Sequence, residues 1–245
     1  MIEQLKKIIQ ESTNIVFFGG AGVSTESGVP DFRSENGLYN AVKQYGYPPE
    51  ELLSFSFFKS HTEIFFDYYK NNLIYKDAQP NKAHLALARL EAAGKVKAVV
   101  TQNIDGLHQI AGSINVLELH GSVLHNHCMD CGVGYGLDYI MDTANCTGSI
   151  PKCQACGGIV RPNVVLYEEP LNEAVINGAT LAISRADTLI VGGTSLVVYP
   201  AAGLINYFKG KNLVLINKSS TQYDHRANLV INEAIGQVLG SVVEN

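Results

Sequence analysis

The chain has 245 residues, of which 46% are apolar and 17% charged, and its formal net charge is −5. This length and apolar content suffice for a sizeable buried core, in one domain or in one domain with a small appendage. Basic residues form no cluster beyond isolated pairs such as Lys6-Lys7, which argues against nucleic acid as the main partner.

No segment is typical of membrane insertion or export. No apolar run reaches the ~18 residues that a membrane span needs, so we expect no membrane partner. Residues 1–10 predict an amphipathic helix and not a signal peptide, because they lack a continuous apolar stretch and a small-residue cleavage site. We therefore expect a cytoplasmic protein.

A glycine-rich segment follows the first predicted strand, residues 14–18. Glycines here allow a close backbone approach to a pyrophosphate, and a following helix start offers unpaired N–H groups. The third glycine of the usual dinucleotide motif is replaced by Thr25. A tight strand-to-helix turn is the alternative, but a turn alone does not require the proline, carboxylate, aromatic and guanidinium groups that follow: Pro30, Asp31, Phe32 and Arg33.

Apolar strand-like runs alternate with helical patterns, which predicts an α/β fold with a Rossmann-like parallel sheet covered by helices on both faces. The predicted strands are 14–18, 96–100, 115–119, 163–167, 187–191, 212–216 and 228–231, and the helices 81–93, 171–185, 199–209 and 233–243. Two segments interrupt the alternation, an aromatic-rich helical insertion (34–75) and a cysteine-containing insertion (121–162). We expect these to form a small domain beside a nucleotide-binding domain of residues 1–33, 76–120 and 163–245.

The cysteine-containing insertion holds two Cys-x-x-Cys pairs, Cys128/Cys131 and Cys153/Cys156, separated by 21 residues. Four thiolates at this spacing predict a closed tetrahedral zinc site with a structural role. Disulfides are disfavoured in a cytosolic chain, and redox-active pairs are the other alternative. The paired spacing leaves three nearby candidates outside the ligand set: Cys146, His125 and His127.

Polar residues follow two of the predicted strands. Gln102, Asn103 and Asp105 come after the strand at 96–100, and His120 ends the strand at 115–119. Since the ordinary pKa of histidine is ~6.5, His120 suits general-base chemistry near neutral pH. For His108, a structural role is favoured over a catalytic one.

Several motifs occur in the order found in one known family. They are Gly20-Ala-Gly-x-Ser-x-x-Ser-Gly-x-Pro-Asp-Phe-Arg33, Thr101-Gln-Asn-Ile-Asp-x-Leu-His108, Glu118-Leu-His-Gly121, the two cysteine pairs and Gly193-Thr-Ser-Leu196. From about residue 14 to 240 the chain resembles the sirtuins, the NAD-dependent protein deacylases. The resemblance implies NAD as co-substrate, one structural Zn²⁺ ion and acetylated lysine peptides or proteins as partners.

The resemblance also implies roles for individual positions. His120 would be the base, and Asn103 would act with it. NAD would contact Gly20, Ala21, Gly22, Thr25, Phe32, Arg33, Gln102, Asn103, Ile104, Asp105, His120, Gly193, Thr194, Ser195, Asn217 and Ile235. Val165, Tyr167 and Val198 would line the acyl-lysine tunnel, and the backbones near 166–169 and 196–198 would hold the peptide as an added strand.

The chain departs from the family pattern in the peptide-binding segment, where Tyr167-Glu168-Glu169 replaces Phe-Gly-Glu. Losing the glycine is expected to stiffen this loop, and the extra carboxylate favours basic flanking residues. Family members that prefer succinyl or malonyl groups carry a Tyr-x-x-Arg motif, whereas Tyr45-Gly-Tyr-Pro48 here has no arginine. A buried acyl carboxylate would then have no cation beside it, so we expect acetyl-lysine to be preferred. Longer neutral acyl groups are a second class of possible substrate.

Three functions are compatible with these features. The first is an NAD-dependent protein deacetylase that transfers the acetyl group to ADP-ribose and releases nicotinamide. The second is a protein ADP-ribosyltransferase, which has less need of the base His120. The third is a non-catalytic NAD-sensing or zinc-ribbon interaction module, which the presence of Asn103, Asp105 and His120 disfavours.

Overall fold

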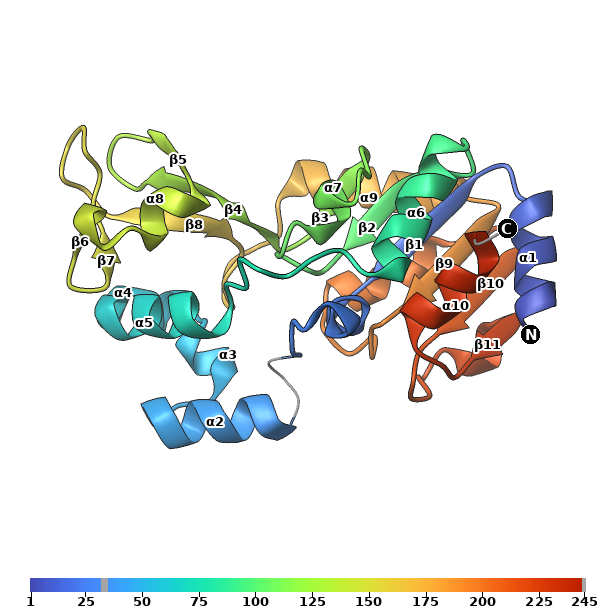
Figure 1. Cartoon of the computed structure of the whole chain (residues 1–245), viewed down its shortest axis with the longest axis horizontal. Helices are drawn as coiled ribbons and strands as arrows, with labels where there is room; N and C mark the ends of the chain where they lie inside the picture. Colours follow the sequence, from blue (N-terminus) through green and yellow to red (C-terminus); the bar gives the residue numbers. More distant parts are fainter. Residues whose placement is uncertain (32–34, 244–245) are drawn as a thin grey trace.

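A computed structural model describes residues 1–31 and 35–243, and the side chains of all of these except 35–39. The molecule is elongated and has two parts (Figure 1). One part is built on a six-stranded sheet and contains both ends of the chain. The other, called the small part below, contains helices α2–α5 and strands β4–β8.

The six-stranded sheet is parallel throughout and has the order β11-β10-β9-β1-β2-β3. Its strands are β1 (Ile15–Gly19), β2 (Val96–Thr101), β3 (Val116–Glu118), β9 (Thr188–Gly192), β10 (Asn212–Ile216) and β11 (Leu229–Ile231). The first three strands are added outward from β1 in one direction and the last three in the other. The order therefore reverses between β1 and β9, the position at which sheets of this class bind ligands.

Helices cover both faces of this sheet, because alternate strand residues point to opposite faces and nearly all are apolar. One face packs against α1 (Ile2–Glu11), α6 (Lys82–Ala92) and α10 (Ile235–Val243). The other packs against α9 (Glu173–Arg185) and the 3-10 helix η4 (Ala201–Tyr207). Shorter helices lie in the connections: α7 (Leu107–Ile110), η1 (Ala21–Val23), η2 (Thr25–Ser27) and η5 (Asp224–Arg226).

The small part has its own apolar core, which joins both insertions. Its helices are α2 (Glu35–Tyr45), α3 (Pro49–Leu52), α4 (Phe55–Ser60), α5 (Thr62–Asn72), α8 (Leu137–Met141) and η3 (Thr143–Asn145). Strands β5 (Gly134–Gly136), β4 (Gly121–Cys128) and β8 (Val160–Val164) form an antiparallel sheet, and β6 (Cys146–Thr147) pairs with β7 (Ile150–Pro151). Edge-to-face rings such as Phe58 on Phe65, with centroids 4.9 Å apart, fill the core of the helical insertion.

The predicted fold class is confirmed, but one predicted strand was placed wrongly. The run 163–167 was expected in the parallel sheet, whereas β8 ends at Val164 and pairs antiparallel with β4. The reason lies at Gly121, whose φ of +74° turns the chain away from β3. A Cβ there would lie 1.8 Å from the Asn163 carbonyl oxygen, so glycine allows the two strands to meet.

Most other predicted elements agree with the structure to within a few residues. The predicted helix at 199–209 is a 3-10 helix of seven residues. The domain boundaries at 34–75 and 121–162 stay a prediction. Among the described residues, no helix is long and apolar enough to cross a membrane.

Candidate active site

A cavity of about 250 Å³ lies where the strand order reverses, between the parallel sheet and the small part. Nine residues that the sequence nominates line it: Ala21, Gln102, Asn103, Ile104, Asp105, His120, Val165, Tyr167 and Val198. They come from the segments after β1, β2, β3, β8 and β9. The residues after β1, β2, β3 and β9 gather here because the carboxyl ends of parallel strands meet at one edge of the sheet. Val165 and Tyr167 follow β8, which pairs antiparallel with β4 and brings them to the same edge.

The glycine-rich segment after β1 lies beside the cavity and contacts the loop after β9. The Gly22 N–H donates to the Gly193 carbonyl oxygen at 2.8 Å. A Cβ on Gly22 would lie 2.7 Å from Gly193 Cα, and Gly193 has a φ of +62°. The loops after β1 and β9 are thus in backbone contact, and a side chain at either glycine would separate them.

An amide, a hydroxyl and a carboxylate form a chain of hydrogen bonds at the cavity wall. Asn103 Nδ2 donates to Ser24 Oγ at 2.9 Å, and Ser24 Oγ donates to Asp105 Oδ2 at 2.6 Å. The Leu107 N–H donates to Asp105 Oδ1 at 2.9 Å. Sequence analysis assigned no role to Ser24, which is 1% exposed and lines the cavity; its place within the glycine-rich motif was the available signal.

The tautomer of His120 follows from its partner. Its Nδ1 lies 2.9 Å from the Gln102 carbonyl oxygen, and because a carbonyl only accepts, Nδ1 must carry the proton. In the neutral imidazole the lone pair then resides on Nε2, the nitrogen that a general base uses. The Val165 N–H donates to the His120 carbonyl oxygen at 2.9 Å, which ties this residue to the expected tunnel wall.

His108 lies outside the cavity, which favours the structural interpretation. It is 1% exposed and its ring centroid lies 4.7 Å from that of His84, another fully buried histidine. Burial lowers the pKa of His108 to about 3 and that of His84 to about 4, because a charged imidazole is poorly solvated there. Both rings are therefore neutral at pH 7.

Two residues that the sequence assigns to NAD binding, Thr194 and Asn217, lie beside the cavity without lining it. Gln102 Nε2 donates to Thr194 Oγ1 at 3.0 Å, and the Thr194 N–H donates to Asn217 Oδ1 at 2.9 Å. Asn217 is 8% exposed, and its Nδ2 has no hydrogen-bond partner among the described residues. A buried donor without an acceptor is costly, so this site suits a ligand that brings one, such as a ribose hydroxyl.

The remaining nominated cofactor residues differ in exposure. Thr25 is exposed and its Oγ1 donates to the Gly22 carbonyl oxygen at 3.0 Å. Ser195 is also exposed, whereas Ile235 is 3% exposed and packs against Gly192. Gly20 is buried beside Thr194. Phe32 and Arg33 lie outside the described residues.

The apolar side of the cavity includes residues that sequence analysis missed, because they belong to other elements and carry no motif. They are Leu53, Leu73 and Leu166, with Leu171 and Tyr75 nearby. Leu53 also accepts a backbone hydrogen bond from Tyr167, and the Phe55 N–H donates to the Tyr167 carbonyl oxygen, both at 3.0 Å. The helical insertion thus shapes the predicted acyl tunnel.

The four paired cysteines form the predicted cluster. Their Sγ atoms all lie within 4.8 Å of one another, with Cys128–Cys156 at 3.4 Å and Cys131–Cys153 at 3.6 Å. Four sulfurs ~2.3 Å from one zinc ion would lie about 3.8 Å apart, so the donor set fits. None of the five cysteines forms a disulfide.

The other candidates lie outside this cluster. His125 and His127 are not among its members, and His127 Nδ1 contacts Asn163 Oδ1. Cys146 Sγ lies 3.2 Å from Lys70 Nζ on α5. The cysteine cluster belongs to the small part, in the β4–β8 region at the opposite end of the molecule from α1 (Figure 1).

Known proteins resemble this chain over nearly its whole length. It is 62% identical over 242 residues to an NAD-dependent protein deacetylase of Clostridium acetobutylicum, covering 99% of this chain and 98% of the relative. It is 64% identical over 244 residues to the protein of the same name from Clostridium perfringens, with the same coverage.

Solved structures of Sir2 proteins are similar to this chain over its whole length. A Sir2 protein with a p53 peptide and NAD⁺ superposes with a TM-score of 0.87 at 37% identity, covering 100% of this chain and 98% of that one. A Sir2 protein bound to an acetylated peptide gives 0.87 at 36% identity with the same coverage. The model of the Sir2 family matches residues 20–200. On its fold, its site and these matches, the chain belongs to the Sir2 family.

Proposed function

We propose that this protein is an NAD-dependent protein-lysine deacetylase. The observation that carries the proposal is the position of His120, which lines the cavity with its Nδ1–H bonded to the Gln102 carbonyl, so that the lone pair of the neutral ring is on Nε2. The names of the relatives and the bound molecules of the similar structures support the same activity.

NAD would supply a ribose carbon from which nicotinamide leaves and hydroxyls that accept the acetyl group. We assign its phosphates to the segment of Gly20, Ala21 and Gly22, with Thr25 beside it, and its adenosine half to Gly193, Thr194, Ser195, Asn217 and Ile235. The nicotinamide half is assigned to Gln102, Asn103, Ile104 and Asp105, with Phe32 and Arg33 from the glycine-rich segment. The orphaned Asn217 Nδ2 supports this direction of binding.

The acyl-lysine amide oxygen would displace nicotinamide from the ribose carbon, which joins the acyl group to the ribose. His120 would then take a proton at Nε2 from a ribose hydroxyl that attacks the acyl carbon, and water would complete the release of the lysine amine and O-acetyl-ADP-ribose. The Gln102 carbonyl holds the ring and its tautomer, so no reorientation is needed at that step. Asn103, fixed by Ser24, would orient the reacting groups. Val165, Tyr167 and Val198 would surround the lysine stem and exclude water that competes with the weakly nucleophilic amide oxygen.

The acyl group is proposed to be acetyl. No Lys or Arg is found among the described residues that line the cavity, which supports a neutral acyl group over a succinyl carboxylate, because burying a carboxylate without a cation is costly. Tyr45 donates to Asp67 at 2.8 Å and packs on Tyr68, and Pro48 precedes α3. These residues, which correspond to the Tyr-x-x-Arg segment, thus serve the small part's own structure.

Zinc would have a structural role. Four cysteine ligands leave no open position for water or substrate, and the bound ion would contribute folding free energy to the loop-rich insertion. We also propose a cytoplasmic location, which the five thiols without a disulfide support. Nucleic acid as a main partner stays disfavoured by the formal charge of −5.

The test is mass spectrometry of products from NAD⁺ with acetyl-, succinyl- and long-acyl-lysine peptides. We expect nicotinamide, free lysine peptide and O-acetyl-ADP-ribose, with little turnover of the succinyl peptide. His120→Ala should lose deacetylation by a factor of roughly 10² or more, the scale of general-base catalysis, and keep part of nicotinamide exchange. Covalently ADP-ribosylated protein without free O-acetyl-ADP-ribose would instead identify a transferase.

A further inference from the structure

Glu168 has an unusual backbone conformation for its residue type. Its φ is +76°, and Leu196 is the other described non-glycine residue with a positive φ. Glycine is expected at this position from the resemblance to the family. Glu168 therefore has a left-handed backbone conformation that glycine adopts readily and that a Cβ disfavours. Other contacts must hold Glu168 in this conformation.

The side chain of Glu168 supplies those contacts. Its Oε2 accepts from the Ser56 N–H at 2.9 Å, and its Oε1 accepts from the Ser56 hydroxyl at 2.8 Å. The preceding residue, Tyr167, is also held by backbone hydrogen bonds: its N–H donates to Leu53 and its carbonyl oxygen accepts from Phe55. Two charge-assisted hydrogen bonds thus fix both the loop and the direction of the carboxylate.

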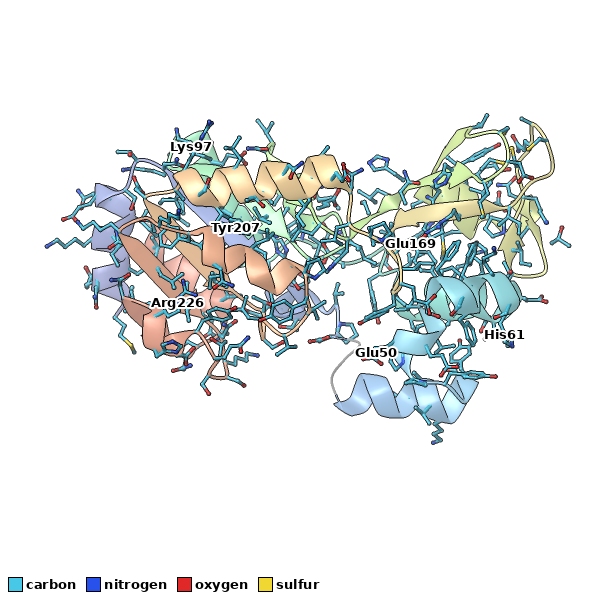
Figure 2. All side chains as sticks on the ribbon, turned by 180° about the vertical axis from the view of Figure 1, so that it is seen from behind. Glu50, His61, Lys97, Glu169, Tyr207 and Arg226 are labelled. Atoms are coloured by element: carbon cyan, nitrogen blue, oxygen red, sulfur yellow. The ribbon has the colours of Figure 1, made fainter. Side chains whose placement is uncertain are left out.

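Glu168 differs from its neighbour Glu169 in its charged partners. Its neighbour Glu169 forms a paired contact with Arg161, at 2.7 and 2.9 Å, near the junction of the two parts (Figure 2). In contrast, Glu168 is exposed, and no Lys or Arg of the described residues lies within 4.0 Å of its carboxylate. Both glutamates line the cavity, so Glu168 presents an oriented negative charge beside the proposed peptide site.

We propose that Glu168 is a specificity-determining residue that selects acetylated lysine peptides with a lysine or arginine close to the acetyl-lysine. The proposal rests on the proposed deacetylase function. Each carboxylate oxygen keeps a lone pair beyond its bond to Ser56, which a flanking ammonium or guanidinium group can use. An ordinary family member with glycine here lacks that acceptor.

The experiment compares three acetyl-lysine peptides that differ only in flanking residues: arginine, alanine and glutamate. For the unmodified protein we expect KM for the arginine peptide to be about two- to fivefold below that for the alanine peptide, the range of an exposed charge pair. The preference should shrink at high salt, because exposed charges are screened. Glu168→Gln and Glu168→Gly should each bring the ratio close to 1.

Glu3→Gln is the matched control. It removes one negative charge on α1, at the far end of the molecule (Figure 1), and should leave the ratio unchanged. A ratio of 1 in the unmodified protein, or a preference that survives both Glu168 variants, would overturn the role of Glu168.

Binding of fluorescently labelled peptides without turnover separates this role from the proposed function. A charge preference in binding that depends on Glu168, with no peptide deacetylated, would refute the deacetylase and leave the selectivity intact. Deacetylation with no such preference would refute the selectivity alone.

Discussion

Single hydrogen bonds decide the chemistry of the proposed site. The Gln102 carbonyl selects the tautomer of His120, and Ser24 joins Asn103 to Asp105. Each bond joins the loop after β2 to another loop, to His120 after β3 or to Ser24 after β1, so each depends on the loops having met. The residue types were visible in the sequence, whereas the partners were not.

The role of Ser24 can be tested with Ser24→Ala. The change leaves Asn103 Nδ2 without its acceptor and removes the donor to Asp105 in a buried place. Because a hydrogen bond to a charged group contributes about 1.5–3 kcal/mol, we expect kcat/KM to fall roughly tenfold to hundredfold. Ser60→Ala on α4 is the control. Unchanged steady-state kinetics for Ser24→Ala would show that the chain of hydrogen bonds is not used.

At the scale of elements, the insertion that carries the cysteines buries few apolar side chains. It packs into the small part through buried positions such as Cys128, Ile140 and Cys153. Tyr135 Oη lies 3.1 Å from Cys153 Sγ. A metal-bound thiolate has no proton, so the tyrosine must be the donor there, and such bonds around the ligands hold a metal more tightly.

Tyr135→Phe should therefore weaken zinc binding. We expect the affinity to fall roughly tenfold or more, measured as zinc transfer to a chromophoric chelator. Tyr139→Phe is the matched control, because Tyr139 stacks on Tyr135 but donates to the Lys152 carbonyl oxygen at 2.6 Å. Equal zinc transfer by the two variants would refute the prediction. Cys128→Ser, which removes a ligand, should lose zinc and soluble folding.

At the scale of the whole molecule, the cavity depends on both parts. Asn103, Asp105 and His120 come from the parallel sheet's loops, whereas Leu53 and Leu73 come from the helical insertion. The stability of the fold also depends on contacts between distant segments. The buried pair His84 and His108 lies between α6, α7 and the sheet, and between about pH 6.5 and 4 it stays neutral only while the chain is folded.

This pair predicts how stability depends on pH. Unfolded histidines take up protons below pH ~6.5, whereas the folded pKa values are about 4 for His84 and about 3 for His108. The folded state binds fewer protons between these values, so the free energy of unfolding should fall as pH drops from about 6.5 to 4. The loss approaches about 1.4 kcal/mol per pH unit for each histidine.

The measurement is chemical unfolding at several pH values for the parent and for His108→Phe. The variant should have the smaller slope over this range. Glu118, whose pKa burial raises, contributes a slope of opposite sign, but it is present in both proteins and cancels in the difference. Equal slopes would show that His108 is not neutral and buried in the folded state.

The class of fold, the cysteine cluster and nine of the residues that line the cavity could be predicted from the sequence alone. Periodicity reports which faces are buried, and short motifs report local chemistry, so both can be read without knowing the fold. The strand at 163–167 was misplaced because an apolar run does not reveal its partner, and pairing depended on a left-handed turn at Gly121.

Which groups meet depends on how the whole chain folds. The contact of Ser24 with Asp105, the apolar wall from the helical insertion and the anchoring of Glu168 by Ser56 all join segments distant in the chain. The spacing of residues along a sequence carries no information on such contacts, because they form when the loops at the carboxyl ends of separate strands, and the insertion packed beside them, come together.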